Sequence, residues 1–335
     1  MTAALAQAAK VIQHGDRFLL TCHVLPDADA LGSMLGLGEV LRALGKDVYL
    51  YSPDPIPTKL AFMPGTDAVQ LELPPGRRFD GTLVTDTAAR NLLPDDFPSR
   101  EVTGPVIMVD HHVVHDDFGD ILLRDESACA TAMVVLQLAR VLGVAPVPLS
   151  AATPLYAAIV ADTGGFRYPG TTSTTLRVAA ELLDAGIDPW HVASNVFENW
   201  PMARLRLLGA AIHALEVLHA ERLALICIPR SMLVESGATE RMIDGLVEYG
   251  RMLQGVEIAV TLWEREPRRA ADGSGSNNPV TRVSLRSAGR FNVAKIAKEF
   301  GGGGHHAAAG ATLSVDLIQA RRRVLEVIGA VLSAT

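Results

Sequence analysis

The fold is decided by residues 17–44, RFLLTCHVLPDADALGSMLGLGEVLRAL. The stretch begins with an apolar run at 17–24 that predicts a buried strand, and from Leu31 to Leu44 apolar residues recur at helical spacing. Two aspartates, Asp27 and Asp29, lie in the turn between these segments. A strand, a turn and a helix in this order indicate the start of a parallel α/β sheet.

The same alternation continues through the first half of the chain. Three further apolar runs predict strands, and they lie at 47–52, 79–86 and 105–110. Helical spacing recurs at 131–141 and at 171–185. Alternating strands and helices predict an α/β fold, with flanking helices and a parallel sheet that is covered on both faces.

The pattern changes beyond residue 215. A loop rich in glycine, serine and asparagine separates two strand-like segments, 256–266 and 281–289. This half predicts a smaller α+β domain. Because 335 residues exceed one ordinary domain, we expect two domains joined by a linker. We expect the active site in the cleft between the two domains. The parts are a catalytic domain at 1–186, a helical linker at 187–215 and a substrate-binding domain at 216–335.

Composition and charge limit the classes of function. The chain is 49% hydrophobic and 20% charged, with a formal net charge of −7. Binding to long duplex nucleic acid needs many Lys and Arg contacts to phosphates, so the acidic balance argues against it and favours a small anionic substrate. No signal peptide and no stretch of roughly 20 apolar residues is visible. The three cysteines form no CxxC pair. We expect a cytoplasmic protein with no membrane partner.

Aspartates and histidines gather in four short motifs. The motifs are HVLPDADALGS at 23–33, Asp86 in VTDTA, DHH at 110–112 and Asp162 in IVADTGGF. We expect each to lie at the carboxyl end of a strand or in the loop after it, where ligands bind in open parallel sheets. One aspartate after a strand is often only a helix N-cap. Four such turns together predict one shared ligand site.

The donor set of these motifs suits divalent metal ions. Carboxylates with a few imidazoles and no thiolates favour Mn²⁺, or Mg²⁺ as the alternative, over structural zinc. Asp27, Asp29, Asp86 and Asp162 carry four negative charges, which match two divalent ions. Two ions about 3.5–4 Å apart can clamp the attacking and leaving oxygens of a displacement at phosphorus. Without metal, the carboxylates repel one another, and we expect some to take up protons.

In order and approximate spacing, the motifs resemble those of the DHH phosphoesterase family. The run GGGGHHAAAG at 301–310 resembles the signature of the DHH-associated C-terminal domain. The likeness covers nearly the whole chain. Its length and two-domain layout are similar to the branch of bifunctional oligoribonucleases and 3′-phosphoadenosine-5′-phosphate phosphatases.

The resemblance implies two metal sites that share one carboxylate, Asp86. The first site consists of His23, Asp27 and Asp86, and the second of Asp29, Asp86, His111 and Asp162. Water held between the ions would attack the phosphorus.

Two further residues of the DHH motif receive catalytic roles from the resemblance. His112 would contact the scissile phosphate or its leaving oxygen, and Asp110 would orient a neighbouring ligand. For His112, a purely structural hydrogen bond is an equally good interpretation.

In the second domain the resemblance implies contacts to the nucleotide end of the substrate. The implied binding residues are Arg286, Ser287, Asn292, Gly303 and His305. Glycines let backbone N–H groups approach an anion because they have no Cβ. His306 stands where similar proteins often carry Lys or Arg, and near its reference pKa of roughly 6.5 a histidine is only partly charged. We therefore expect phosphate binding to improve in mild acid.

Three functions stay open on the sequence. The first is hydrolysis of short oligoribonucleotides to mononucleotides, with 3′-phosphoadenosine 5′-phosphate to AMP as a second activity. The alternative is a phosphodiesterase for cyclic or linear dinucleotides, which would use the same metal site. A non-catalytic nucleotide sensor is the third, and the complete set of carboxylates argues against it.

The oligomeric state is not encoded in the sequence pattern, but if a homodimer forms, we expect it to use an edge strand of the sheet.

Overall fold

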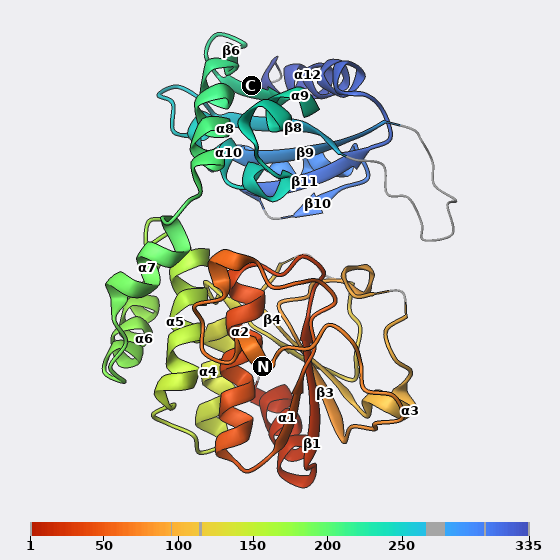
Figure 1. Cartoon of the computed structure of the whole chain (residues 1–335), viewed down its shortest axis with the longest axis vertical. Coiled ribbons are helices and arrows are strands. Elements are labelled where there is room, and N and C mark those ends of the chain that lie inside the picture. Colours follow the sequence, from red (N-terminus) through yellow and green to blue (C-terminus); the bar gives the residue numbers. More distant parts are fainter. Residues whose placement is uncertain (1, 95, 114–115, 266–278, 305, 334–335) are drawn as a thin grey trace. The chain divides into compact units, whose positions relative to one another are not determined.

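The chain folds as two units, Met1–Asn199 and Trp200–Thr335, each with its own sheet. The computed structural model describes residues 2–94, 96–113, 116–265, 279–304 and 306–333 (Figure 1). The division between the units falls between helices α7 (Pro189–Phe197) and α8 (Met202–His213). Pro201 is the N-cap residue of α8, and the four residues before α8 interrupt the helical pattern of the expected linker.

The sheet of the first unit has five parallel strands in the order β2-β1-β3-β4-β5. The strands are β1 (Arg17–Cys22), β2 (Asp47–Leu50), β3 (Gly81–Thr85), β4 (Val106–Asp110) and β5 (Ile121–Arg124). Four of them lie in the predicted runs, and the α/β fold with a parallel sheet is confirmed. Strand β5 was not predicted, because its apolar run comprises only three residues before Arg124.

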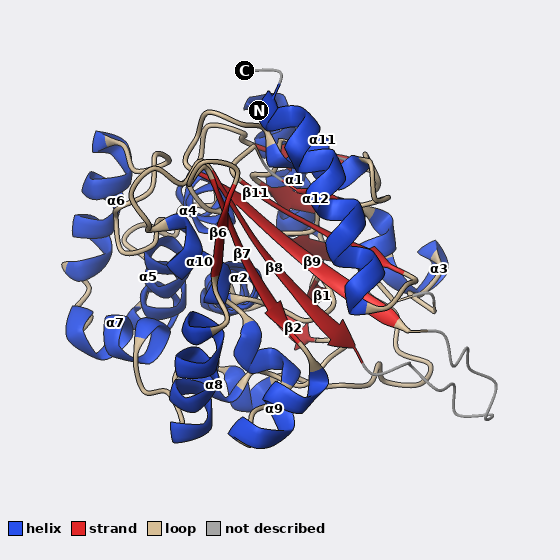
Figure 2. Ribbon diagram, turned by 90° about the horizontal axis from the view of Figure 1, so that it is seen from above, coloured by secondary structure: helices blue, strands red, loops and turns tan. Residues whose placement is uncertain are grey.

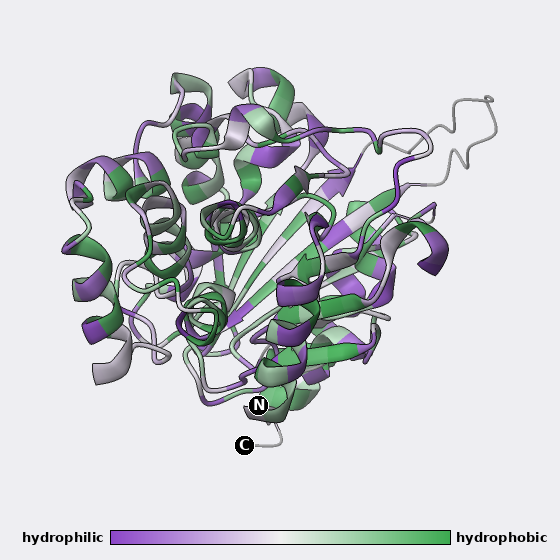
Figure 3. Cartoon of the chain, turned by 90° about the horizontal axis from the view of Figure 1, so that it is seen from below, coloured by the Kyte–Doolittle hydropathy of each residue, from purple (hydrophilic) through white to green (hydrophobic). Residues whose placement is uncertain are grey.

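The long helices of this unit share one core on one face of the sheet (Figure 1). They are α1 (Thr2–His14), α2 (Ala28–Ala43), α4 (Thr131–Val141), α5 (Leu149–Asp162), α6 (Ser173–Leu183) and α7. Strand residues such as Phe18, Leu83 and Ile107 contribute to this core. Apolar residues dominate the strands in Figure 3, whereas helices of the molecule mix both kinds.

The two faces of the sheet are covered differently. Leu19, Tyr51 and Phe79 form a small separate cluster, and the β3–β4 connection contributes only the four-residue helix α3 (Arg100–Thr103). Right-handed crossovers account for the asymmetry. The step from β1 to β2 runs one way along the sheet and carries α2, whereas the later steps run the other way and consist mostly of irregular chain.

Helices α2 and α5 pack closely because two glycines of α2 lie at their contact. A Cβ on Gly32 would lie 2.4 Å from the carbonyl oxygen of Pro154, and one on Gly36 would lie 2.4 Å from Cγ of Leu155. Gly32 also faces Ala158, so the contacts run in opposite directions along the two helices. The end of α5 therefore lies beside the start of α2.

The second unit contains a mixed sheet of six strands in the order β10-β11-β9-β8-β7-β6, in which only β7 and β8 are parallel (Figure 2). The strands are β6 (Glu216–Leu218), β7 (Leu223–Ile228), β8 (Ile258–Arg265), β9 (Val280–Ser287), β10 (Gly303–Gly304) and β11 (Ala308–Leu313). The expected α+β domain is confirmed, although β10 and β11 were not predicted.

Two groups of helices pack on the sheet of the second unit. One core contains α11 (Val293–Lys298) and α12 (Leu317–Ser333), and another contains α8, α9 (Arg230–Ser236) and the start of α10 (Leu246–Arg251). Within the part of the chain that the structure describes, no helix has the length and apolar character required to cross a bilayer.

The α2–α5 contact generates a stability prediction. Replacing Gly32 by alanine should lower the free energy of unfolding by about 1–3 kcal/mol, because the new methyl group overpacks a backbone carbonyl. Denaturant unfolding followed by circular dichroism measures it. Gly209→Ala in α8 is the matched control, since its added Cβ meets nothing within 4 Å and should stabilise by roughly 0.5–1 kcal/mol. Equal stability of the Gly32 variant and the wild type would contradict the packing argument.

Candidate metal centre

The loop after β1 places the first histidine and aspartate of the site. His23 Nδ1 is 2.8 Å from the carbonyl oxygen of Val24, and its Nε2 is 3.7 Å from Oδ2 of Asp86. Such a carbonyl contact orients the ring and directs Nε2 to a ligand. Asp27 is the N-cap of α2, and its Oδ1 accepts the N–H groups of Asp29 and Ala30 at 3.0 Å each. Asp27 thus serves as a helix cap while remaining within reach of His23.

Asp86 lies at the centre of the site, directly after β3. Its backbone is left-handed, with φ of 53°, and its N–H donates to the carbonyl oxygen of Val109. Aspartate tolerates this conformation better than most residues. The side chain is buried, and its Oδ1 is 3.7 Å from Nε2 of His111 and 3.6 Å from Nδ1 of His112. With His23, three imidazoles therefore surround one carboxylate.

A second group of donors gathers around His111. Its Nε2 is 3.6 Å from Oδ2 of Asp29 and 3.3 Å from Oδ2 of Asp162, while Nδ1 is 3.2 Å from the carbonyl oxygen of Ala128. The expected position of Asp162 at a strand end is wrong, because Asp162 is the last residue of helix α5. The antiparallel contact of α5 with α2 brings it beside Asp29.

The ligand atoms form three overlapping groups, in each of which they lie within 4.8 Å of one another. The groups are His23–Asp27–Asp86, Asp29–His111–Asp162 and Asp86–His111–His112. Asp86 belongs to the first and the third of these groups, and His111 belongs to the second and the third. Carboxylate oxygens and imidazole nitrogens in such clusters are the donors that Mn²⁺ and Mg²⁺ sites use. The residues present therefore fit a pair of divalent ions.

Asp110 and His112 are joined by a short hydrogen bond. Nδ1 of His112 is 2.7 Å from Oδ1 of Asp110, and the same oxygen accepts the N–H of His111 at 2.8 Å. Asp110 is fully buried at the end of β4. This carboxylate thus orients both histidines of the motif.

The histidines and the central carboxylate form a mutually stabilising set of charges. Burial disfavours a charge on His23, but the hydrogen bond to Asp86 and nearby negative charge outweigh it and raise the pKa of His23 to about 9. Burial likewise opposes a charge on His112, yet Asp110 and Asp86 raise the pKa of His112 to about 9. Burial would raise the pKa of Asp86, but His23 and His112 lower it below its usual range.

Two other carboxylates, those of Asp29 and Asp162, have pKa values shifted in the opposite direction. Burial, followed by the charge of Asp86, raises the pKa of Asp29 well above its usual range. Burial and the charge of Asp29 do the same to the pKa of Asp162. The expectation that some carboxylates of the metal-free site take up protons agrees with these directions. Metal binding must therefore displace protons from the site.

Thr131 contacts two of the carboxylates and was not among the predicted site residues. Its backbone N–H donates to Oδ2 of Asp29 at 2.7 Å, and its hydroxyl donates to Oδ1 of Asp86 at 2.9 Å. The N–H of Ala132 donates to Oδ1 of Asp29 at 3.2 Å. Thr131 begins α4, whose N-terminus therefore faces the carboxylate of Asp29. The only sequence signal was a threonine at the start of a helix, which ordinarily indicates a cap.

In the second unit the predicted binding residues lie around β9, α11 and β10. Arg286 donates from Nε to Oε1 of Glu248 at 2.8 Å, and Ser287 is buried next to it. Oδ1 of Asn292 accepts the N–H groups of Ala294 and Lys295 and caps α11. The side chains of Arg286 and Asn292 are thus already held by structural contacts.

The glycine run differs from position to position. A Cβ on Gly302 would lie 2.1 Å from the carbonyl oxygen of Gly310, and Gly304 has a φ of 137° that side chains rarely adopt. Gly303 is exposed, and a Cβ there would meet nothing within 4 Å. The backbone of Gly303 is therefore open to a ligand. His305 lies outside the described residues.

Comparisons with known proteins cover almost the whole chain. A family model described as "DHH family, N-terminal domain" matches residues 17–159, and one described as "DHHA1 domain" matches residues 225–334. The chain is 37% identical to the bifunctional oligoribonuclease and PAP phosphatase NrnA of Thermus thermophilus, over 97% of this chain and 92% of that protein.

A second relative and a solved structure agree with this match. The protein of the same name from Bacillus subtilis is 29% identical over 89% of this chain and 90% of its own length. An exopolyphosphatase-related protein from Bacteroides fragilis superimposes with a TM-score of 0.85 at 25% identity, and the match covers 100% of this chain and 96% of that one.

The contacts of Thr131 generate a prediction about metal affinity. Thr131→Val removes the hydroxyl and keeps the shape and the backbone N–H, so Mn²⁺ affinity should fall by roughly tenfold or more, as is typical for partners of metal ligands. Calorimetric titration of Mn²⁺ into the metal-free protein measures it. Thr131→Ser retains the hydroxyl and should bind close to wild type. Equal affinity of the valine variant and the wild type would remove this role.

Proposed function

The chain belongs to the DHH family, and from that membership and the geometry of its metal centre we propose that it is a metal-dependent phosphoesterase. Its proposed activities are the hydrolysis of short oligoribonucleotides to mononucleotides and of 3′-phosphoadenosine 5′-phosphate to AMP. The observation that carries the proposal is Asp86, whose carboxylate belongs to both the His23 and the His112 groups of donors. Two ions held around one carboxylate suit displacement at phosphorus. Full-length similarity to proteins named for both activities supports the choice of substrates.

The ions that we propose are Mn²⁺ first and Mg²⁺ second. The donors are oxygens and imidazole nitrogens, which suit these ions. Cys22 precedes His23, but it is fully buried, and burial raises the pKa of its thiol far above the usual range. A neutral buried thiol is not available as a thiolate ligand. This argues against a zinc–thiolate site.

Each side chain of the centre has a task that its contacts suggest. Bound divalent ions would polarise the phosphate and activate water, which is the chemistry that two-metal sites supply. Asp86 would hold the ions close together, while Asp29 and Asp162 balance the charge around His111. His112 faces Asp110 through Nδ1, and in its protonated form it would neutralise a phosphate oxygen or protonate the leaving oxygen.

We propose that the second unit binds the nucleotide end of the substrate. Gly303 offers an open backbone, and Glu248 orients the guanidinium of Arg286. Bidentate contact of an arginine with a phosphate requires such a fixed orientation. Ser287 directly follows Arg286 in β9, and Asn292 is the N-cap residue of α11. We include His305 in the same proposed binding site. We place this activity in the cytoplasm and propose a homodimer as the state to test.

A product assay tests the proposed function. Two- to five-residue RNA should be cleaved to mononucleotides in the presence of Mn²⁺, and Asp86→Asn should lose at least about a thousandfold in kcat, since the charge that holds two ions is gone. The panel also contains 3′-phosphoadenosine 5′-phosphate, a cyclic dinucleotide and a linear dinucleotide. Asp80→Asn, a remote aspartate that pairs with Arg17, is the matched control.

The outcomes separate the candidate functions. Activity restricted to the cyclic dinucleotide would contradict the oligoribonuclease and identify a signalling phosphodiesterase. Binding of nucleotides without turnover of any substrate would identify a sensor.

Gly303 supplies a prediction about the second unit. Gly303→Val should leave the melting temperature unchanged, because its side chain enters open space, and should raise KM for short RNA by about tenfold through obstruction of the approaching anion. Steady-state kinetics measure this. Gly209→Ala, also exposed and open, is the control. An unchanged KM would show that the substrate does not approach Gly303.

A further inference from the structure

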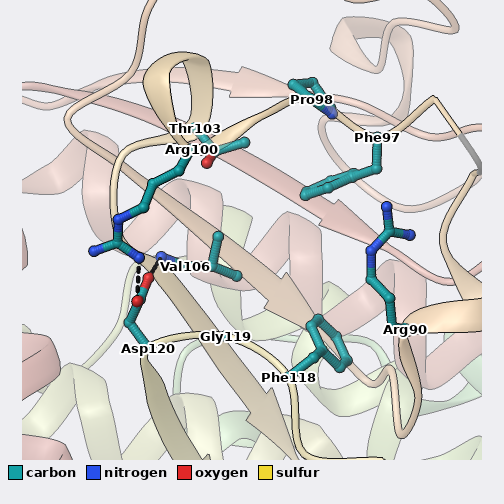
Figure 4. A pocket seen from close by; sticks show the side chains of 9 residues that line it. All are labelled: Arg90, Phe97, Pro98, Arg100, Thr103, Val106, Phe118, Gly119 and Asp120. Carbon is teal, nitrogen blue, oxygen red and sulfur yellow. Dashed lines mark hydrogen bonds and ion pairs between the residues drawn. The ribbon is translucent and has the colours of Figure 1, made fainter.

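The first unit carries a pocket that the metal centre does not use. It has a volume of about 290 Å³ and lies between the segment that follows Asp86 and the start of β4 and β5 (Figure 4). Its lining includes two phenylalanines, Phe97 and Phe118, and two arginines, Arg90 and Arg100. Pockets for small molecules range from roughly 300 to 1,000 Å³. The volume therefore suits one small group rather than a whole oligonucleotide.

The two aromatic rings are half-buried and border the pocket. Figure 4 shows Phe97 and Phe118 on opposite sides of it, with the side chain of Arg90 reaching toward Phe97. The guanidinium of Arg90 lies 5.3 Å from the centre of the Phe97 ring. Phenyl rings beside an arginine are how proteins stack the bases of single-stranded RNA without reading their sequence.

The charge of the pocket favours an anionic ligand. Arg100 forms an ion pair with Asp120, so its charge is already balanced. Arg90 donates to the carbonyl oxygen of Pro94 at 3.2 Å, and among the described residues no carboxylate forms an ion pair with it. The pocket thus has one guanidinium that a phosphate can still neutralise.

One end of the pocket, at Arg90, is linked to the loops of the metal centre, whereas its other end, at Val106 and Asp120, lies at the amino ends of β4 and β5. Arg90 follows Asp86 by four residues, so their Cα atoms are at most about 14 Å apart. The short helix η3 (Arg90–Leu92) is tied to the His23 loop, because the N–H of Val24 donates to the carbonyl oxygen of Leu92 at 2.9 Å. The N–H of Asp116 donates to the carbonyl oxygen of Ala88 at 2.9 Å, which ties the segment before Phe118 to the same loop.

We propose that this pocket binds the base of the nucleotide next to the scissile phosphate, stacked on Phe97 or Phe118, with Arg90 on a backbone phosphate. The assignment rests on the proposed oligonucleotide hydrolysis and deepens it. Stacking on phenyl rings is tolerant of base identity, which suits an enzyme that degrades short RNA of any sequence. A ligand with a single base, such as 3′-phosphoadenosine 5′-phosphate, does not use this pocket.

The test compares a dinucleotide with a counterpart that lacks the second base. Calorimetry measures the binding of both to the full-length protein with Ca²⁺ in place of the activating ion, so turnover is not required. Wild type should bind the complete dinucleotide about tenfold more tightly than its abasic counterpart. This affinity ratio should fall to about one in Phe97→Ala, in Phe118→Ala or in the double variant. It should stay near the wild-type value in Phe97→Tyr and Phe118→Tyr, which keep an aromatic ring. Leu71→Ala, a half-exposed apolar residue outside the pocket, is the matched control.

A second readout separates this proposal from the proposed function. In the Mn²⁺ enzyme, the ratio of kcat/KM for dinucleotide to kcat/KM for 3′-phosphoadenosine 5′-phosphate should fall about tenfold in the alanine variants. A wild type that cleaves no dinucleotide can still bind the complete dinucleotide more tightly than the abasic one, with a preference that Phe97→Ala removes. That result would support base binding in the pocket and contradict the oligoribonuclease activity. A wild type that does not distinguish the abasic ligand, or a preference that survives in the double alanine variant, overturns the pocket.

Discussion

The first unit depends on how it compensates the buried charge of Asp86. Its carboxylate is removed from water at the end of β3, and a buried carboxylate is costly unless it is paired and hydrogen-bonded. His23 and His112, whose pKa values are raised, supply positive charge, and the hydroxyl of Thr131 supplies a hydrogen bond. Two divalent ions in the same place would supply more positive charge. They would also neutralise Asp29 and Asp162, whose raised pKa values favour protonation in the metal-free protein.

Close helix packing makes this convergence possible. The glycines of α2 allow α5 to approach so closely that no larger residue fits at Gly32. Because the two helices run in opposite directions, the last residue of α5 meets the first turn of α2. The metal centre thus combines donors from strand ends with one donor from a helix end, and the helix contact determines the position of that last donor.

The sequence predicted the parts of the site that depend on local pattern. His23, Asp86 and His111 follow strands whose apolar runs are unmistakable, and the family resemblance grouped them with Asp27 and Asp29. Asp162 was chosen correctly as a member of the cluster, but its element was wrong because the apolar run before it is equally typical of a buried helix. Thr131 was missed because its role arises from contacts with residues about 45 and 102 positions away along the chain. Likewise, β10 was missed because a glycine run carries no strand signal and pairs only through its neighbour β11.

The most direct test of the two-ion site is anomalous diffraction from crystals grown with Mn²⁺. The account predicts two anomalous peaks about 3.5–4 Å apart, with oxygens of Asp86 within bonding distance of both ions. His23 and Asp27 should contact one ion, and His111, Asp29 and Asp162 the other. A single peak, or two peaks of which only one contacts Asp86, would contradict the assignment of this carboxylate as the bridge on which the proposed chemistry depends.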